Sequence, residues 1–141
     1  MKKKGFQYYF FEVKSTLANF SSAIIEINKW YTQEIFTERY LLEYNLIKDR
    51  VNSSLIQDTD KKTIDNDLES LARSLVNEEI PEEKYHFCGF ILTEMFNKQN
   101  IAAFNKAEMF RNGFDAILEV KNLKKIIKEA YLCLGITLKG K

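Results

Sequence analysis

Apolar residues recur at helical spacing along most of the chain. Near the N-terminus they stand alternately four and three positions apart, which is the heptad-like stripe of an amphipathic helix. The stripe consists of Phe6, Phe10, Val13, Leu17, Phe20, Ile24 and Ile27. A second apolar arc runs from Thr32, a suitable N-cap, to Asn52. One helix over residues 6–52 would be about 70 Å long, so we expect two helices with a break near residues 31–33, and one continuous helix is the alternative.

The rest of the chain repeats the helical pattern. A short amphipathic helix is predicted from Ile64, Leu68, Leu71 and Leu75. Pro81 indicates the start of a further helix, in which the uncharged stretch 85–93 would be apolar all round and central in a bundle. The four-and-three spacing returns over residues 103–117, interrupted by Asn112-Gly113, and Asn122 caps a last helix. The sequence therefore predicts an all-α single domain, residues 1–141, as a bundle of five or six helices with a short C-terminal tail.

Length, composition and charge change this interpretation little. The 141 residues suffice for one domain, and a hydrophobic content of 45% is typical of a globular chain. Basic and acidic residues number 21 and 20, so the overall charge gives no support for nucleic-acid binding. The longest uncharged stretch, residues 15–25, is too short to cross a bilayer, and no signal peptide is recognisable. We expect a cytoplasmic protein that does not contact membranes.

Few residues suggest chemistry. His86 is the sole histidine, and its Glu-x-x-His pair with Glu83 lacks the second such pair that a bundle metal site requires. On a helix, His86 and Cys88 would point to different sides and could not bind one ion together. The acidic cluster at residues 78–83 is typical of a solvated helix start. We therefore expect no cofactor, no metal and no enzymatic activity; a small-molecule pocket around Tyr85, His86 and Cys88 has the least support.

Aromatic residues provide the leading functional hypothesis. The chain has 11 Phe, 7 Tyr and 1 Trp, and many lie in its first third. The two predicted helices there carry more apolar surface than the remaining helices can cover. Such surplus apolar surface favours a homodimer interface or a groove for a partner helix. The candidate partner-binding residues are Phe6, Phe10, Val13, Leu17, Trp30, Tyr31, Tyr40 and Tyr44. On this hypothesis the protein is a non-enzymatic helical interaction module or small regulatory adaptor.

A lysine-rich face on the last predicted helix provides the alternative. Its members stand at positions i, i+3, i+4 and i+7, which places them on one side of a helix: Lys121, Lys124, Lys125 and Lys128. Such a face can neutralise phosphates, so the alternative function is a nucleic-acid-associated regulator. The same helix has no Arg or Gln to read bases, and a solvated face opposite a buried stripe explains the lysines equally simply.

Overall fold

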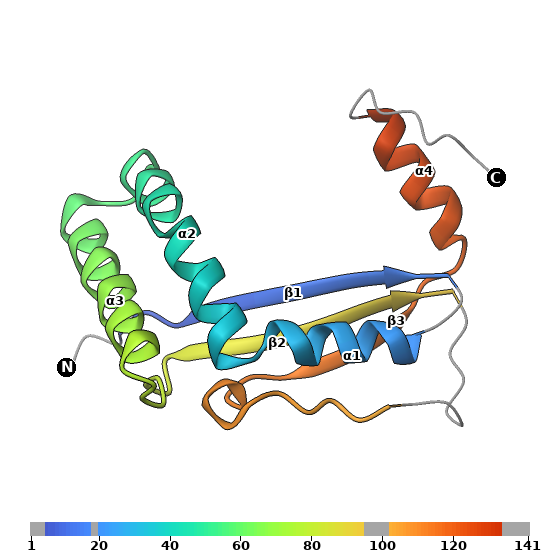
Figure 1. The fold of residues 1–141 in the computed structure, drawn as a ribbon. Helices are drawn as coiled ribbons and strands as arrows, with labels where there is room; N and C mark the ends of the chain where they lie inside the picture. Colours follow the sequence, from blue (N-terminus) through green and yellow to red (C-terminus); the bar gives the residue numbers. More distant parts are fainter. Residues whose placement is uncertain (1–4, 18–19, 95–101, 134–141) are drawn as a thin grey trace.

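The structure, a computed structural model, describes residues 5–17, 20–94 and 102–133. It is a mixed α/β fold, so the expected all-α bundle is wrong. The elements in chain order are β1 (Tyr8–Thr16), α1 (Phe20–Trp30), α2 (Gln33–Asn52), α3 (Asp58–Val76), β2 (Tyr85–Thr93), the 3-10 turn η2 (Glu108–Phe110), β3 (Asp115–Glu119) and α4 (Leu123–Cys133) (Figure 1).

The three strands form one parallel sheet in the order β1-β2-β3. Tyr8 lies opposite Tyr85 at the start of the long β1–β2 ladder, and Gly89 lies opposite Asp115 where β3 joins. Before the first β2–β3 residue pair, the Phe87 N–H already donates to the Asn112 carbonyl at 2.7 Å. β2 is therefore hydrogen-bonded along both of its edges. β1 is therefore an edge strand in the described sheet.

The first half of the N-terminal predicted helix and the whole of the helix predicted after Pro81 are strands, whereas Phe20–Trp30 is helical as expected. Residues 8–16 and 85–93 both form parallel strands, although their apolar spacing and lack of charge indicated helices. Strands of a parallel sheet are apolar toward both faces and read as continuous apolar runs rather than as an alternation. The four consecutive aromatic residues 8–11 are such a run. The burial of β1 alternates residue by residue, which identifies it as a strand and not as a helix stripe.

The predicted helix over residues 103–117 is also wrong. Residues 102–107 have no regular structure, and only the short η2 turn and then β3 follow. The expected break at Asn112-Gly113 is confirmed as a bend before β3. Gly113 has φ +147°, and a Cβ atom there would collide with the backbone of Phe87. This bend lets the chain enter the sheet beside β2.

Several local predictions are confirmed. The N-terminal helices break at residues 31–32, so a single helix over residues 6–52 is excluded, and α2 ends at Asn52 as expected. The four apolar residues of the third predicted helix are all buried in α3. α4 begins directly after Asn122. The predicted tail after residue 133 lies outside the described residues.

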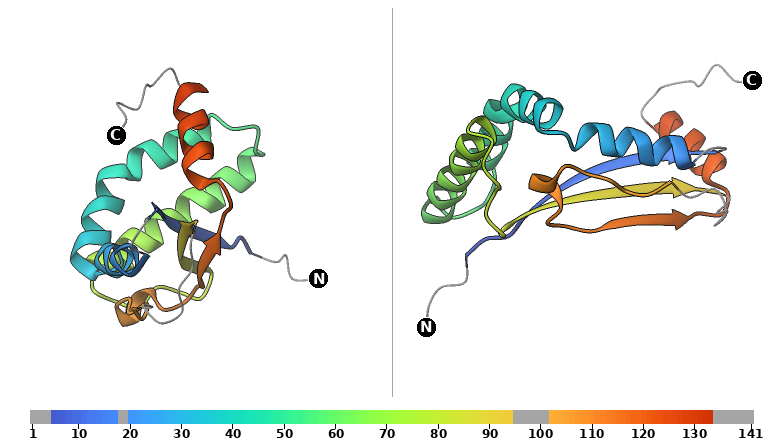
Figure 2. Two further views of the ribbon diagram at one scale, coloured as in Figure 1. Left: turned by 90° about the vertical axis from the view of Figure 1, so that its right-hand side faces the viewer. Right: turned by 60° about the horizontal axis from the view of Figure 1, so that its bottom comes forward.

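One face of the sheet is covered by α1, with α2 and α3 at its end. α1 lies along this face, and α2 and α3 pack together beyond the end where β1 and β2 begin (Figures 1 and 2). The same face receives residues 102–110, whose Phe104, Ala107 and Phe110 pack into or against the core. The core centres on rings: Phe87 of β2 lies 5.3 Å from Phe36 and 5.0 Å from Phe110, centroid to centroid. We call this the inner face, and the opposite one the open face.

Candidate functional site

The open face of the sheet is apolar and lacks a covering layer within the described chain. In Figure 2, α1 lies on the other side of the sheet, and α4 stands at the carboxyl end of the strands rather than along this face. Three side chains of β1 alternate onto this face, and each is about half exposed: Tyr9 50%, Phe11 53% and Val13 51%. Phe114 and Leu118 on the β3 side are 49% and 45% exposed. Parallel sheets are normally covered on both faces, so this open face is unusual.

Aromatic rings form a connected row across the open face. The imidazole of His86 stacks on Tyr9 with ring centroids 4.5 Å apart, and Tyr9 in turn lies 6.2 Å from Phe11. Phe11 lies 5.5 Å from Phe90, and Phe90 contacts Phe114 edge to face, also at 5.5 Å. The other side chains on this face of the three strands are Val13, Ser15, Cys88, Leu92, Ala116 and Leu118. None of these strand positions is Lys, Arg, Asp or Glu, so the surface suits an apolar and uncharged contact.

The free edge of β1 adjoins this face. Tyr8 N–H donates to the Lys84 carbonyl at 2.8 Å, so the even-numbered residues of β1 direct their backbone groups toward β2. The odd-numbered residues therefore direct theirs to the free edge, because N–H and C=O directions alternate along a strand. Tyr9, Phe11 and Val13 thus present the open face with their side chains and the free edge with their backbones.

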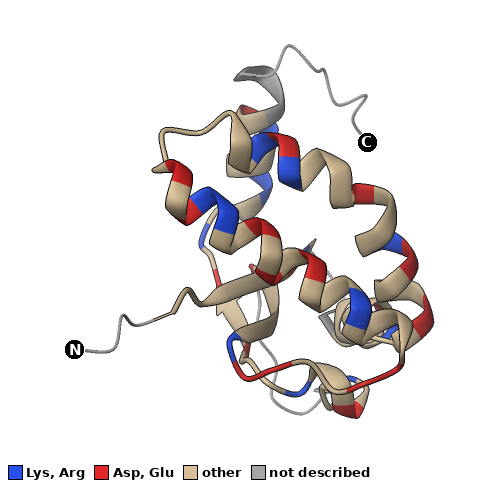
Figure 3. Cartoon of the chain, turned by 90° about the vertical axis from the view of Figure 1, so that its left-hand side faces the viewer, with Lys and Arg blue, Asp and Glu red and all other residues tan. Residues whose placement is uncertain are grey.

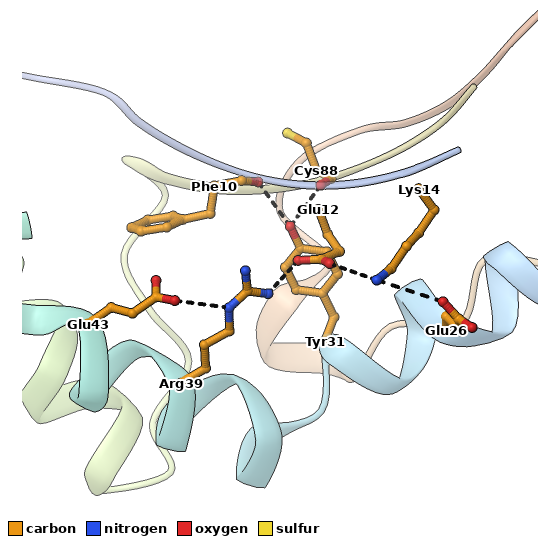
Figure 4. Close-up of polar contacts among 8 residues, drawn as sticks. All are labelled: Phe10, Glu12, Lys14, Glu26, Tyr31, Arg39, Glu43 and Cys88. Atoms are coloured by element: carbon orange, nitrogen blue, oxygen red, sulfur yellow. Dashed lines mark hydrogen bonds and ion pairs between the residues drawn. The ribbon is translucent and has the colours of Figure 1, made fainter. Parts of the chain in front are cut away.

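Charged residues gather on the inner side of β1 and fix the helices to it (Figure 4). The Arg39 guanidinium lies 2.6 Å from Glu12 and 3.4 Å from Glu43. The Lys14 ammonium lies 3.4 Å from Glu12 and 3.7 Å from Glu26. Burial alone would lower the pKa of Arg39, but the hydrogen bond and charge of Glu12 outweigh it and raise the pKa. The Glu12 carboxylate is therefore held between two cations and links β1 to α2.

Tyr31, at the junction of α1 and α2, connects these helices to the sheet by hydrogen bonds. Its hydroxyl donates to the Phe10 carbonyl at 3.0 Å and to the Cys88 carbonyl at 2.7 Å (Figure 4). Burial raises the pKa of Tyr31 well above its ordinary value, so the phenol stays protonated as a donor. A cavity of about 110 Å³ beside it, lined by Phe10, Glu12 and α2 residues, is smaller than the 300–1,000 Å³ of typical ligand pockets.

A buried ion pair joins β3 to the inner face. The Lys106 ammonium, with a side chain 5% exposed, lies 3.0 Å from Asp115 and donates to the Phe87 carbonyl at 2.6 Å. Asp115 also accepts the Gly89 N–H at 2.9 Å. Lys106 further lies 5.3 Å from the ring centre of Tyr31. These contacts satisfy both charges, and they explain how a lysine is tolerated in the core.

The structure separates the predicted partner-binding residues. Tyr31 and Tyr40 are buried, while Phe10 and Tyr44 are partly buried and pack against the core, so these four belong to the inner face. Trp30 is half-buried beneath the Arg39 guanidinium, 4.6 Å from its ring centre. Phe6 is half-buried ahead of β1. The structure thus does not bring the eight residues together as one surface.

Only Val13 and Leu17 of the predicted set are exposed, at 51% and 44%. Sequence reasoning missed Tyr9, Phe11 and Phe114, which form the aromatic row with Phe90. The signal was the run of aromatic residues 8–11, in which every second side chain faces the same way in a strand.

Other exposed apolar residues lie in a different setting. On α2, Leu42 is 79% and Leu46 51% exposed, but acidic and basic residues are interspersed along α2 and α3 (Figure 3). Scattered exposed apolar residues are normal on protein surfaces. The open face differs because its rings touch one another and no strand position on it is Lys, Arg, Asp or Glu.

The predicted lysine face is present on the surface. All four lysines are exposed in or just before α4, and among them Lys125 lies 4.0 Å from Glu129. Leu123 is buried at the start of the helix, whereas Ile126 is 48% exposed. α4 projects from the carboxyl end of the sheet (Figure 1), and its three lysines of this face are exposed.

The residues considered for chemistry do not converge. His86 and Cys88 share the open face of β2, so the expectation that they point apart on a helix is wrong; Tyr85 lies on the inner face. His86 Nε2 lies 2.8 Å from the Gln7 side-chain oxygen, and Cys88 is a buried free thiol. Within the described residues, no group of three or more His, Cys, Asp or Glu side chains is placed to hold a metal ion.

Comparison with known proteins gives no relative: no family matches the chain, and neither a curated protein nor a solved structure is significantly similar to it. Among the described helices, none combines the length and the apolar character needed to span a membrane.

Proposed function

We propose that the chain is a non-enzymatic interaction module that docks an apolar helix of a partner protein on the open face of its sheet. The observation that carries this proposal is the connected row of rings on that face, in which Tyr9, Phe11 and Phe114 are each about half exposed. The proposal replaces the aromatic helix pair as the contact surface, because those residues lie largely in the core.

The type of partner follows from the layer structure. Strands of a parallel sheet are joined by right-handed crossovers, so a chain that runs β1-β2-β3 in one direction places its connections on one face. Here both α1 and residues 102–110 lie on the inner face. The open face therefore needs a layer from elsewhere, and helices are the layer that covers parallel sheets. Because the face is uncharged, the docking side of that helix should be apolar.

The charged cluster at Glu12 fits this proposal as scaffold. Its carboxylate is held by Arg39 and Lys14, and the cluster connects β1 to α1 and α2. The carboxylate is engaged in ion pairs with two cations, at 2.6 Å from Arg39 and 3.4 Å from Lys14, and these contacts tie the strand to the helices. The network keeps β1 rigid, and a rigid strand presents its outward rings in one fixed arrangement.

The test is a site-specific photo-cross-linker placed at Phe11. Leu42 is the matched control, since it is an exposed apolar residue among charged neighbours on α2. In native cells, position 11 should form a discrete protein adduct that position 42 does not. Mass spectrometry should place the adduct in an amphipathic helix of the partner. Phe114→Ser should abolish the adduct at position 11.

Two results would overturn the proposal. Equal adducts at positions 11 and 42 would show non-specific contact. Adducts at position 11 that consist of nucleic acid, or that persist unchanged in Phe114→Ser, would show that the ring row is not a helix-docking surface.

The accessible lysines of α4 support a second candidate, a nucleic-acid-associated regulator. A helix side with several exposed lysines neutralises phosphates and gives salt-dependent affinity. A gel shift across salt concentrations tests it: the triple substitution Lys124→Gln, Lys125→Gln and Lys128→Gln should flatten the salt dependence. An unchanged salt slope, or no shift at low salt, would reject this candidate.

A further inference from the structure

β1 offers a long unpaired edge. It is nine residues long, and in the described sheet only its β2 side is paired. The backbone groups of Tyr9, Phe11, Val13 and Ser15 point to the free edge, as the Tyr8 N–H bond to Lys84 establishes. Exposed strand edges are templates for pairing with another strand. No proline lies in β1 to block such pairing on this edge.

The charges of β1 favour one pairing of the strand with itself, in addition to the ion pairs that Glu12 makes with Arg39 and Lys14 makes with Glu26 within one copy. In an antiparallel pair related by a twofold axis at Val13, Glu12 lies opposite Lys14 of the second copy, and Lys14 opposite its Glu12. A twofold axis at residue 12 would set Glu12 against its own copy, and an axis at residue 14 would do the same for Lys14. An axis at Phe11 brings no charges together. Opposite charges across strands stabilise pairing, whereas like charges oppose it.

The backbone supports the same register. Val13 directs its N–H and C=O to the free edge, so two copies of Val13 can exchange both hydrogen bonds across the axis. Phe11 then pairs with Ser15 of the second copy in the same manner. Glu12 and Lys14 direct their backbones to β2 and form the narrow, non-hydrogen-bonded positions, where side chains approach closest.

We propose that the chain forms a twofold dimer through antiparallel pairing of β1 with β1 of a second copy, centred on Val13. The product is one continuous six-stranded sheet. Paired residues of adjacent strands share a face, so the two open faces lie side by side and double the length of the docking surface. The dimer goes beyond the proposed function and does not depend on it, since it uses the edge of β1 rather than the open face.

The first experiment is sedimentation of the full chain over a concentration series. The wild type should be a dimer. Val13→Pro should be monomeric, because proline removes the N–H that points to the free edge while the bonds of β1 to β2 remain. Val13→Lys serves as a second variant, since it sets two lysines opposite each other at the axis. Leu55→Ser, a fully exposed residue in the turn between α2 and α3, should leave the dimer unchanged.

The second experiment tests the register by charge exchange. Glu12→Lys and Lys14→Glu each set like charges opposite at two places, so each alone should dimerise at least about tenfold more weakly than wild type. Mixed together, the two variants should form a heterodimer, since every lysine then faces a glutamate. Far-UV circular dichroism and thermal melts confirm that each variant is folded.

A monomeric wild type at high concentration would overturn the dimer, as would a Val13→Pro variant that is folded and still dimeric. Failure of two folded charge variants to form a heterodimer would overturn the register and with it the proposal. None of these results affects cross-linking at Phe11, so failure of the dimer and failure of the proposed docking function are distinguishable.

Discussion

Phe10 and Phe11 are neighbours of identical chemistry on opposite faces of β1, and replacing each with serine separates the two faces. The ring of Phe10 lies 5.8 Å from Phe36, 6.0 Å from Tyr40 and 5.6 Å from Phe87. Phe11 is 53% exposed on the open face. We predict that Phe10→Ser unfolds or severely destabilises the chain, whereas Phe11→Ser leaves it folded.

The magnitudes follow from burial. Removing a core phenylalanine costs about 3–5 kcal/mol, and a hydroxyl left in the apolar space adds to the loss. Full burial of a phenylalanine is worth about 1.5–3 kcal/mol, so a side chain that is half exposed loses only about 1 kcal/mol. The two variants should therefore differ by at least about 2 kcal/mol.

Urea denaturation followed by circular dichroism measures both free energies of unfolding. Phe11→Ser should also lose the cross-linked partner while staying folded. Similar losses of stability in the two variants would refute the assignment of Phe10 and Phe11 to opposite faces. A larger loss for Phe11→Ser would mean that the face called open is the true core.

Three further predictions test the inner face and the bend before β3. Asp115→Ala should lower the free energy of unfolding by about 3–5 kcal/mol, because the Lys106 ammonium is left buried without its carboxylate. The double variant Lys106→Met, Asp115→Leu should recover much of this loss in urea denaturation. A double variant as unstable as the single one would contradict this. Gly113→Ala should lower stability by about 1–3 kcal/mol or more, since φ is +147° and Phe87 blocks the Cβ, while Gly5→Ala, with nothing near its Cβ, should change nothing. Burial raises the pKa of Tyr8, Tyr31, Tyr40 and Tyr85, so the unfolded chain releases these phenolic protons first. The free energy of unfolding should therefore be unaffected by these groups below about pH 10 and should fall as the pH rises above it. Phenolate absorbance from these residues should appear only when the chain unfolds. Ionisation of every tyrosine near pH 10 in the folded chain would contradict this.

The helices α2 and α3 were predictable from sequence because their signals are local. The four apolar residues of α3 are spaced for one helix face, and all are buried. The break before Gln33 followed from the length that one helix would have had. Both inferences concern residues that contact near neighbours in the chain.

The sheet was not predictable in this way. The steps from Phe10 to Val13 and Leu17 fit a helix stripe by coincidence, because β1 carries apolar residues on both of its faces, Phe10 on the inner one and Val13 on the open one. The better signals were the aromatic run 8–11 and the nine uncharged residues 85–93, whose length suits a strand more than a helix. Pairing of β1 with β2 joins residues that lie far apart in sequence, and local periodicity carries no information about such contacts.

The candidate site depends on that same pairing. Val13 and Leu17 were predicted as contact residues and are exposed, but they were placed on a helix with Phe10, which faces the core. Tyr9, Phe11 and Phe114 form one surface only when the strands lie side by side. The four lysines at the end of the chain are exposed, and their proximity could be inferred from sequence because three of them lie on α4 and Lys121 lies just before it.

The most direct test of an uncovered sheet face is a cysteine-labelling scan of residues 8–13 in the purified chain with both native cysteines replaced. The structure predicts rapid modification by a maleimide at positions 9, 11 and 13 and slow modification at positions 8, 10 and 12, with the chain folded at each. Labelling rates that repeat every three to four residues would indicate that residues 8–13 form a helix and not a strand. Uniformly slow labelling would show that the face is already covered.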